Sequence, residues 1–267
     1  MTPDQIIAQM KKWGVPFKEY KSWRTHNRNH KGPWGPVNGF MWHHTGSDDD
    51  DQRELLYNGH SELPGPLSQF GIAQDGIVWL IGWGRCNHAG LGDDDVLDAV
   101  INETAAPVDD EANTDGNRHF YGAEFWYSGN HPMTSAQYNS GIKLSCAILD
   151  FHDWDEESVI GHGEWQPGKW DPGMKSGTLM NMDLVRSVID TTLAKGPIVG
   201  TPVDGPANKP QVYKDIWGTD SMAKARTSTS DSNNLYWTPE TMLRYAAEQA
   251  ALANQKADKI LKHLGIE

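Results

Sequence analysis

The segment 161–173 constrains the fold of this chain more than any other, because a Pro-Gly pair stands on each side of Lys169-Trp170-Asp171. Proline and glycine at both ends exclude a helix there, so the chain is expected to run extended or turned. In an extended run, residues two apart point the same way, which places the amine of Lys169 and the carboxylate of Asp171 on one face. If His162 folds over the same spot, this segment offers two metal ligands and a cation.

The composition favours a folded, acidic protein. The chain has 267 residues, of which 37% are hydrophobic and 12 are tryptophan, so it can bury a sizeable core. The net charge of -13 comes from 36 acidic and 23 basic side chains without a basic block, which argues against nucleic-acid binding. No apolar run approaches the roughly 18 residues that cross a membrane, so membrane insertion is not expected.

The N-terminus and the cysteines both bear on localisation. The first five residues lack the basic and apolar regions of a secretory signal. Cys86 is expected in a loop and Cys146 in a helix, so both are interpreted as free thiols, which favours a reducing compartment. We therefore expect synthesis in the cytoplasm without a signal peptide, and any export must use another route.

Strand and helix patterns are mixed along the first 195 residues. The apolar runs 67–73 and 77–81 flank an Asp-Gly turn, which predicts a hairpin. Further strands are predicted at 37–46, 119–127 and 158–162. Two helices are predicted to start at the capping boxes 2–5 and 134–137. A third helix is predicted at 183–195, with Leu184 on its inward face. This order favours an α/β domain with a central sheet.

The last quarter of the chain is expected to be separate from the domain at 1–195. Residues 196–210 are rich in Pro and Gly and are interpreted as a linker between a domain at 1–195 and a C-terminal region at 211–267. In that region a helix is predicted from Thr238, with Leu, Ala and Ile recurring at spacings of three and four. Such a seam fits self-association through a close-packed helix pair. It also fits a single amphipathic helix, and a wall-targeting role stays open.

Three candidate metal ligands lie far apart in the sequence. They are an imidazole at the end of the strand 37–46, His162 and Asp171. His43 and His44 are adjacent in that strand and face opposite sides, so they cannot easily serve one site together. Two histidines and a carboxylate suit Zn2+, and three protein ligands leave a fourth position for water, as in catalytic zinc sites.

Two other carboxylate features have different interpretations. The run Asp48-Asp49-Asp50-Asp51 lacks the alternating spacing and the distal Glu of an EF-hand, so it is interpreted as solvated residues before a helix. Glu124 has apolar neighbours on both sides in the predicted strand 119–127, which is unusual for a charged side chain.

Five motifs follow one another along residues 37–175. They are Trp42-His43-His44-Thr45, Phe70-Gly71-Ile72 with Asp75-Gly76, Asn87-His88-Ala89-Gly90, Tyr121-Gly122-Ala123-Glu124, and His162 with Pro167-Gly168-Lys169-Trp170-Asp171-Pro172-Gly173. In this order they resemble the motifs of the type 2 N-acetylmuramoyl-L-alanine amidases, a superfamily that includes peptidoglycan recognition proteins and many phage endolysins. The variant around Ser68 and the long acidic insertion look most like lysins of phages that infect actinobacteria.

The resemblance implies a fold and a set of site residues. The fold is a central mixed β-sheet flanked by helices. Zinc would be bound by His43, His162 and Asp171. Glu124 would be the catalytic carboxylate and Lys169 the catalytic lysine. His88 would border the substrate groove, and Ser68 would stand near the substrate where some members carry a tyrosine.

The resemblance also implies an activity. The expected reaction is hydrolysis of the amide bond between N-acetylmuramic acid and L-alanine in bacterial peptidoglycan, carried out at the cell wall by a phage endolysin. Zinc would make hydroxide available at neutral pH, Glu124 would transfer a proton to the leaving amine, and Lys169 would stabilise the oxyanion. Two alternatives are a non-catalytic peptidoglycan-binding module and a virion-associated wall hydrolase. The complete set of three candidate ligands argues against the binding module.

Overall fold

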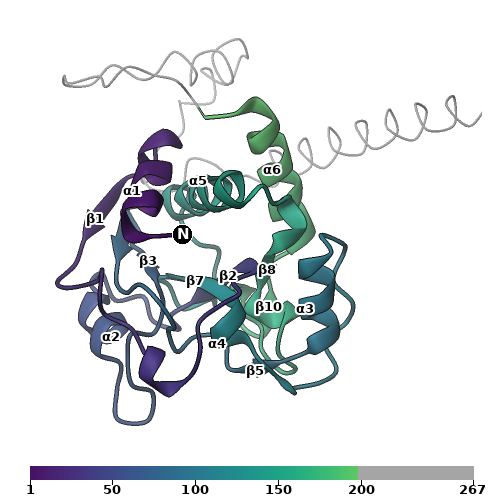
Figure 1. Cartoon of the computed structure of the whole chain (residues 1–267), viewed down its shortest axis with the longest axis horizontal. Helices are drawn as coiled ribbons and strands as arrows, with labels where there is room; N and C mark the ends of the chain where they lie inside the picture. Colours follow the sequence, from purple (N-terminus) through teal and green to yellow (C-terminus); the bar gives the residue numbers. More distant parts are fainter. Residues whose placement is uncertain (198–267) are drawn as a thin grey trace, which may run out of the picture. The chain divides into compact units, whose positions relative to one another are not determined.

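A six-stranded mixed sheet forms the centre of the computed structural model, which describes residues 1–197 (Figure 1). The strand order is β1-β4-β3-β7-β2-β8. The strands are β1 Phe17–Glu19, β2 Gly39–His44, β3 Phe70–Ile72, β4 Val78–Leu80, β7 Phe120–Phe125 and β8 Val159–Gly161. Strands β3, β7, β2 and β8 are parallel, so their C-terminal ends meet at one edge, whereas β4 is antiparallel to β3. The predicted α/β class with a central mixed sheet is confirmed.

Helices cover both faces of this sheet (Figure 1). One side holds α1 Pro3–Lys12, α5 Ser135–His152 and α6 Met182–Lys195. The other side holds α2 Arg53–Asn58, α3 Asp94–Ile101 and α4 Gly116–His119. Two short strand pairs lie apart from the main sheet, β5 Leu91–Gly92 with β6 Thr114–Asp115, and β9 Gly173–Lys175 with β10 Thr178–Leu179. Within residues 1–197, every helix is too short or too polar to cross a bilayer.

Several elements form where local sequence signals predict them. The hydroxyl of Thr2 accepts from the backbone of Gln5 at the start of α1, and Thr134 does the same with Gln137 at the start of α5. Both are complete capping boxes, which satisfy backbone donors that a helix start leaves unpaired. Strands β3 and β4 form the hairpin predicted around the Asp-Gly turn. Both cysteines are buried and free, as predicted.

The two faces of β2 belong to different cores. Phe40 and Trp42 pack with residues of α1, α5 and α6. Met41 faces the other way and packs with residues of α3 and with Trp165. Because side chains alternate along a strand, His43 follows Met41 onto the face that α3 covers. This alternation decides which of the two adjacent histidines reaches the site described below.

One predicted inward position on α6 is wrong. Leu184 is 45% exposed, whereas Arg186 is 6% exposed and takes a buried position on the same helix. The guanidinium contacts the carboxylates of Glu164 and Asp183 at 2.9 and 2.6 Å, and it donates to the backbone oxygen of Val159. These contacts account for the burial of Arg186 on a helix whose inward positions were expected to be apolar.

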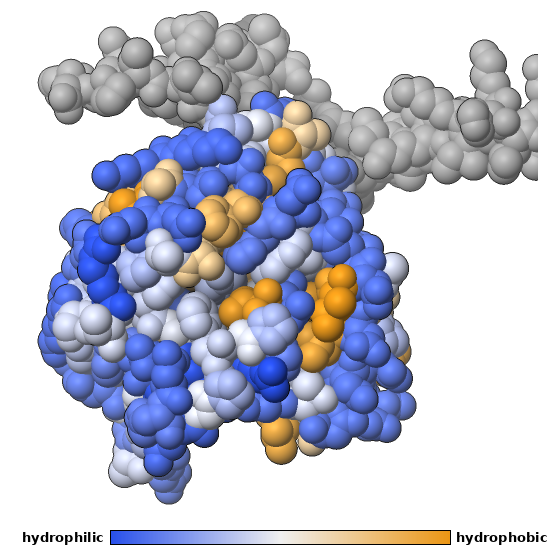
Figure 2. Space-filling view, viewed as in Figure 1, coloured by the Kyte–Doolittle hydropathy of each residue, from blue (hydrophilic) through white to orange (hydrophobic). Residues whose placement is uncertain are grey.

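Hydrophilic residues cover most of the face shown in Figure 2, and hydrophobic residues form only small groups there. This surface agrees with the acidic composition. The predicted linker at 196–210, except its first two residues, and the C-terminal region at 211–267 lie outside the described residues. The self-association predicted for that region therefore stays a prediction.

Candidate metal centre and active site

The parallel strands bring the candidate ligands to one edge of the sheet. In the register, His43 of β2 stands opposite Glu124 of β7. On the other side of β2, Trp42 pairs with Gly161, the last residue of β8. The next residue, His162, therefore emerges beside His43. The chain turns at His162–Glu164 in one turn of 3-10 helix, so the segment 161–173 is not extended throughout.

His43, His162 and Asp171 converge on one point. Nδ1 of His43 lies 3.1 Å from Nδ1 of His162 and 3.1 Å from Oδ2 of Asp171, and Nδ1 of His162 lies 3.0 Å from the same Oδ2. Ligand atoms at zinc–ligand distances of about 2.0–2.2 Å in a tetrahedron are about 3.3 Å apart. The three atoms therefore have close to the spacing that a zinc ion requires, and the residue types are those that zinc prefers.

Burial prepares His43 for metal binding. Its side chain is 1% exposed, and burial lowers the pKa of His43 to about 4. A neutral imidazole is the form that binds a metal, because its free nitrogen lone pair is the ligand. At neutral pH the imidazole of His43 is therefore already uncharged, and metal binding does not require an imidazolium ion to lose a proton first.

Glu124 lies opposite His43 in the sheet, and its carboxyl group has a raised pKa. Burial raises the pKa of Glu124 to about 8, and the negative charge of Asp171 adds to this effect, while Lys169 opposes it. Its Oε2 atom is buried and has no hydrogen-bond partner within residues 1–197. Lys169 is exposed, and it lies close enough to the site for its positive charge to lower the pKa of both Glu124 and His43. A carboxyl group that holds a proton near neutral pH is suited to proton transfer.

His44 serves the opposite face of the strand. Its Nδ1 accepts the backbone N–H of Gly173 at 2.9 Å, and its ring packs against Tyr127 and Trp170. His43 therefore lies with the other two candidate ligands, His162 and Asp171, whereas His44 holds the backbone that follows Asp171. The choice between the two histidines, which strand alternation alone left open, is settled by this geometry.

A family model covers this part of the chain. A family model described as N-acetylmuramoyl-L-alanine amidase matches residues 33–174, which is more than half of the chain and includes all three candidate ligands. This chain belongs to the N-acetylmuramoyl-L-alanine amidase family. The family is one of peptidoglycan hydrolases, which makes peptidoglycan the substrate class that membership implies.

Solved structures of amidases and of a peptidoglycan recognition protein are similar to this chain. The endolysin N-acetylmuramoyl-L-alanine amidase LysCS from Clostridium intestinale URNW is 17% identical over 64% of this chain and 93% of that chain, with a TM-score of 0.44. Drosophila peptidoglycan recognition protein SA is 15% identical over 57% of this chain and 78% of that chain, with a TM-score of 0.35. The E. coli amidase AmiD, solved with an anhydro-N-acetylmuramic acid peptide, is 17% identical over 54% and 55%, with a TM-score of 0.38. No curated protein sequence matches this chain.

The two predicted substrate-binding residues of this amidase-family chain lie inside the protein. Ser68 is fully buried, and its hydroxyl donates to the backbone oxygen of Phe70 at 2.8 Å. His88 is 9% exposed, and its Nδ1 lies 2.9 Å from Nε2 of His43. Neither position supports a direct contact with substrate, and that contact stays a prediction for both residues. His88 lies instead behind the metal group.

Sequence reasoning missed the residues that hold the loop of the amidase site in place. Glu164 accepts from the backbone N–H of Gly161 at 2.9 Å and pairs with the buried Arg186 of α6. The backbone N–H of Gly163 donates to the backbone oxygen of Asp171 at 2.9 Å, which links the segment after His162 to Asp171. For the pair between Glu164 and Arg186, the only signal in the sequence was a cation, Arg186, among the apolar positions of the predicted helix 183–195.

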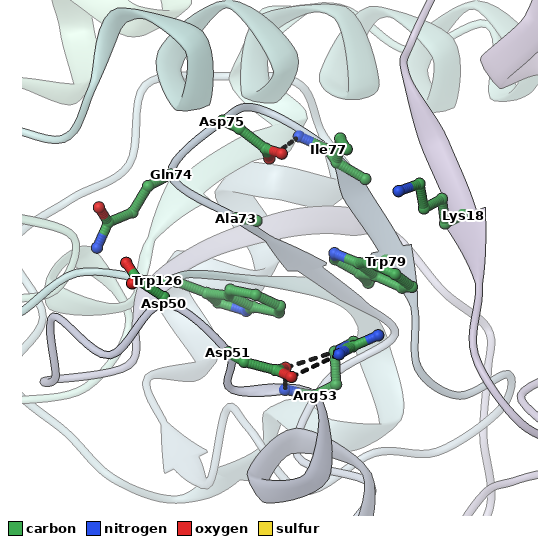
Figure 3. A pocket seen from close by; sticks show the side chains of 10 residues that line it. All are labelled: Lys18, Asp50, Asp51, Arg53, Ala73, Gln74, Asp75, Ile77, Trp79 and Trp126. Atoms are coloured by element: carbon green, nitrogen blue, oxygen red, sulfur yellow. Dashed lines mark hydrogen bonds and ion pairs between the residues drawn. The ribbon is translucent and has the colours of Figure 1, made fainter.

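A separate cavity has a volume of about 310 Å³, and Figure 3 shows the side chains that line it. It is lined by residues that include Trp79, Trp126 and Arg53, and by none of the residues predicted for the site. Within it, Arg53 pairs with Asp51 and lies over the ring of Trp79, 4.4 Å from the ring centroid. Trp79 of β4 stands two strands away from Glu124 of β7. The cavity is therefore a neighbour of the candidate active site and not part of it.

Proposed function

We propose that this protein binds zinc through His43, His162 and Asp171 and hydrolyses the amide bond between N-acetylmuramic acid and L-alanine in peptidoglycan. One observation carries the proposal. The three ligand atoms lie 3.0 to 3.1 Å apart, beside the carboxyl group of Glu124, whose Oε2 is buried and has no hydrogen-bond partner among the described residues. Membership in the amidase family supplies the bond type.

Each residue near the ligands has a role in the proposed reaction. When bound, zinc lowers the pKa of water from about 16 towards 7, so that hydroxide is available near neutral pH. Glu124 takes a proton from the attacking water and passes it to the leaving amine. Lys169 places its positive charge near the carbonyl oxygen, where negative charge develops. One such stabilising group contributes roughly 3 to 4 kcal/mol to a reaction of this type.

Mass spectrometry of purified cell wall tests the activity. After digestion with the zinc-loaded protein, we expect stem peptides with a free N-terminal L-alanine and glycan strands whose muramic acid carries a free lactyl carboxylate. The matched control is Glu124→Gln, which keeps the size of the side chain and removes the acid. If the wild-type protein sediments with the wall and leaves every amide bond intact, the non-catalytic binding module is the correct interpretation.

The biological setting is a second part of the proposal. We propose that the protein is an endolysin, made in the cytoplasm of a phage-infected host and active at its wall. The support is the likeness of the motif around Ser68 and of the acidic insertion to lysins of actinobacterial phages. Proteomic analysis of purified virions separates the two wall-hydrolase settings, because an endolysin is absent from the particle and a virion-associated hydrolase is present in it.

A further inference from the structure

The ligand histidines each have a second ring nitrogen that faces away from the metal group. Nε2 of His43 lies 2.9 Å from Nδ1 of His88, and Nε2 of His88 lies 3.3 Å from the backbone oxygen of Phe120. Nε2 of His162 lies 3.1 Å from Oε1 of Gln166. A histidine can bind a metal through one nitrogen only if that atom carries no proton, so the partners of the other nitrogen matter.

The contacts of His88 fix the direction of its hydrogen bonds. A backbone carbonyl oxygen only accepts, so Nε2 of His88 carries the proton that it donates to Phe120. In a neutral ring, Nδ1 of His88 is then an acceptor, and Nε2 of His43 must be the donor. Nδ1 of His43 is left with a free lone pair, and this is the atom that faces His162 and Asp171.

We propose that His88 is a positioning residue of the metal centre, which accepts the Nε2 proton of His43 and so keeps Nδ1 of His43 free to bind the ion. His88 does not touch the ligand position itself. It acts through His43, by fixing both the tautomer and the orientation of that ring. The inference rests on the proposed zinc site, and it gives His88 a role behind the ligand His43.

The protein holds His88 in place from two directions. Its backbone N–H donates to Oδ1 of Asn117 at 2.8 Å, and the N–H of Ala89 donates to the same oxygen at 2.9 Å. Its ring lies directly over Gly122 of β7, where an added Cβ would come within 2.6 Å of Nδ1. Gly122 stands two residues before Glu124 on the same face of the strand. The sheet therefore leaves a slot that the His88 ring fills.

A pair of variants separates hydrogen bonding from packing. His88→Leu and His88→Asn remove the same ring and introduce side chains of nearly equal size, but only Asn offers an oxygen near the place of Nδ1. We expect His88→Leu to weaken zinc binding by roughly 10- to 100-fold, the usual effect of losing such a partner. His88→Asn should recover most of that loss. His152→Leu, a remote histidine that contacts Tyr121, is the control and should bind zinc as the wild type does.

Zinc affinity is measured by competition with a chelator, and thermal unfolding of the metal-free variants shows whether both fold. Equal losses in the Leu and Asn variants would assign His88 to packing alone and overturn the proposal. Unchanged affinity in both variants would overturn it as well.

A second measurement needs neither metal nor activity. Ring-nitrogen chemical shifts of the metal-free, 15N-labelled protein report the tautomer of each histidine. We expect His43 and His88 both to carry the proton on Nε2, and we expect His43 to lose this preference in His88→Leu. A proton on Nδ1 of wild-type His43 would overturn the proposal. Failure of the wild-type protein to bind zinc would instead remove the proposed function, so the two failures are distinguishable.

Discussion

Burial acts in opposite directions on two cross-strand neighbours, His43 and Glu124. It lowers the pKa of the imidazole to about 4 and raises the pKa of the carboxyl group to about 8. Both shifts favour the uncharged form, because a site with little solvent disfavours charge. The metal-free site therefore holds a neutral ligand and a neutral acid. A bound dication should favour the carboxylate form of Glu124, since opposite charges attract at short range.

The roles proposed for three residues predict different losses. Asp171→Ala should lose zinc, because its Oδ2 contacts both ligand nitrogens. Glu124→Gln and Lys169→Ala should keep zinc, because neither residue is one of the three ligands, and should lose most wall hydrolysis. A zinc assay on each purified variant, followed by a turbidity assay on cell walls, checks these outcomes. Full hydrolysis by either of the last two variants would remove that residue from the mechanism.

The raised pKa of Glu124 predicts a pH-dependent stability. A carboxyl group whose pKa is higher in the folded protein than its usual 4.5 loses its stabilising contribution as pH rises through about 8. Glu124→Gln does not titrate, so the metal-free variant should gain stability relative to wild type as pH increases. We expect the gain to be on the order of 2 kcal/mol larger at pH 8.5 than at pH 6. Urea unfolding at both pH values measures it, and an equal difference at the two would contradict it.

At the scale of elements, the loop 161–173 depends on a helix that follows it in the sequence. Arg186 of α6 pairs with Glu164, which in turn holds the backbone of Gly161 beside the ligand His162. A buried charge left without its partner costs about 3 to 5 kcal/mol. Helix α6 therefore contributes to the site although it carries none of the proposed ligands or catalytic residues.

Arg186→Leu tests this dependence. The variant leaves Glu164 partly buried without its cation, so we expect a loss of about 3 kcal/mol in unfolding free energy and weaker zinc binding. The control is Arg24→Leu, because Arg24 pairs with Asp4 on the surface, where such pairs contribute about 0 to 1 kcal/mol. Denaturant unfolding of the metal-free proteins and zinc competition measure both effects. Equal losses in the two variants would show that Arg186 contributes no more than a surface arginine.

Local signals in the sequence were sufficient for several of the longer elements, but they did not predict β1 of the central sheet. Capping boxes located the starts of α1 and α5, and the Asp-Gly turn located the β3–β4 hairpin. The turn of 3-10 helix at His162–Glu164 was not predicted, and its Glu164 pairs with Arg186, which lies 22 residues later in the sequence. Strand alternation alone left the choice between His43 and His44 open, the resemblance to the amidases pointed to His43, and the parallel partners of β2 place that residue beside His162. Contacts between distant segments were the part that local reasoning could not supply.

At the scale of the whole molecule, the site belongs to the part within residues 1–197, and the region 211–267 has a role that is still a prediction. We expect the predicted helix from Thr238 to pair with its copy if its seam of small residues is an interface. Mass in solution, measured for the full chain and for a chain that ends at residue 210, tests this expectation. A monomeric full chain would contradict self-association and leave the single amphipathic helix, with or without a role in wall targeting.

The ligand residues also span a large part of the chain, because His43 and His162 are 119 positions apart. An ion held by both joins an early strand to a late loop, and its binding energy adds directly to the stability of the folded chain. Chelation should then do more than stop hydrolysis. We expect it to loosen the late segment first, so that proteases cut between residues 162 and 180 in the metal-depleted protein and spare the same bonds in the loaded one.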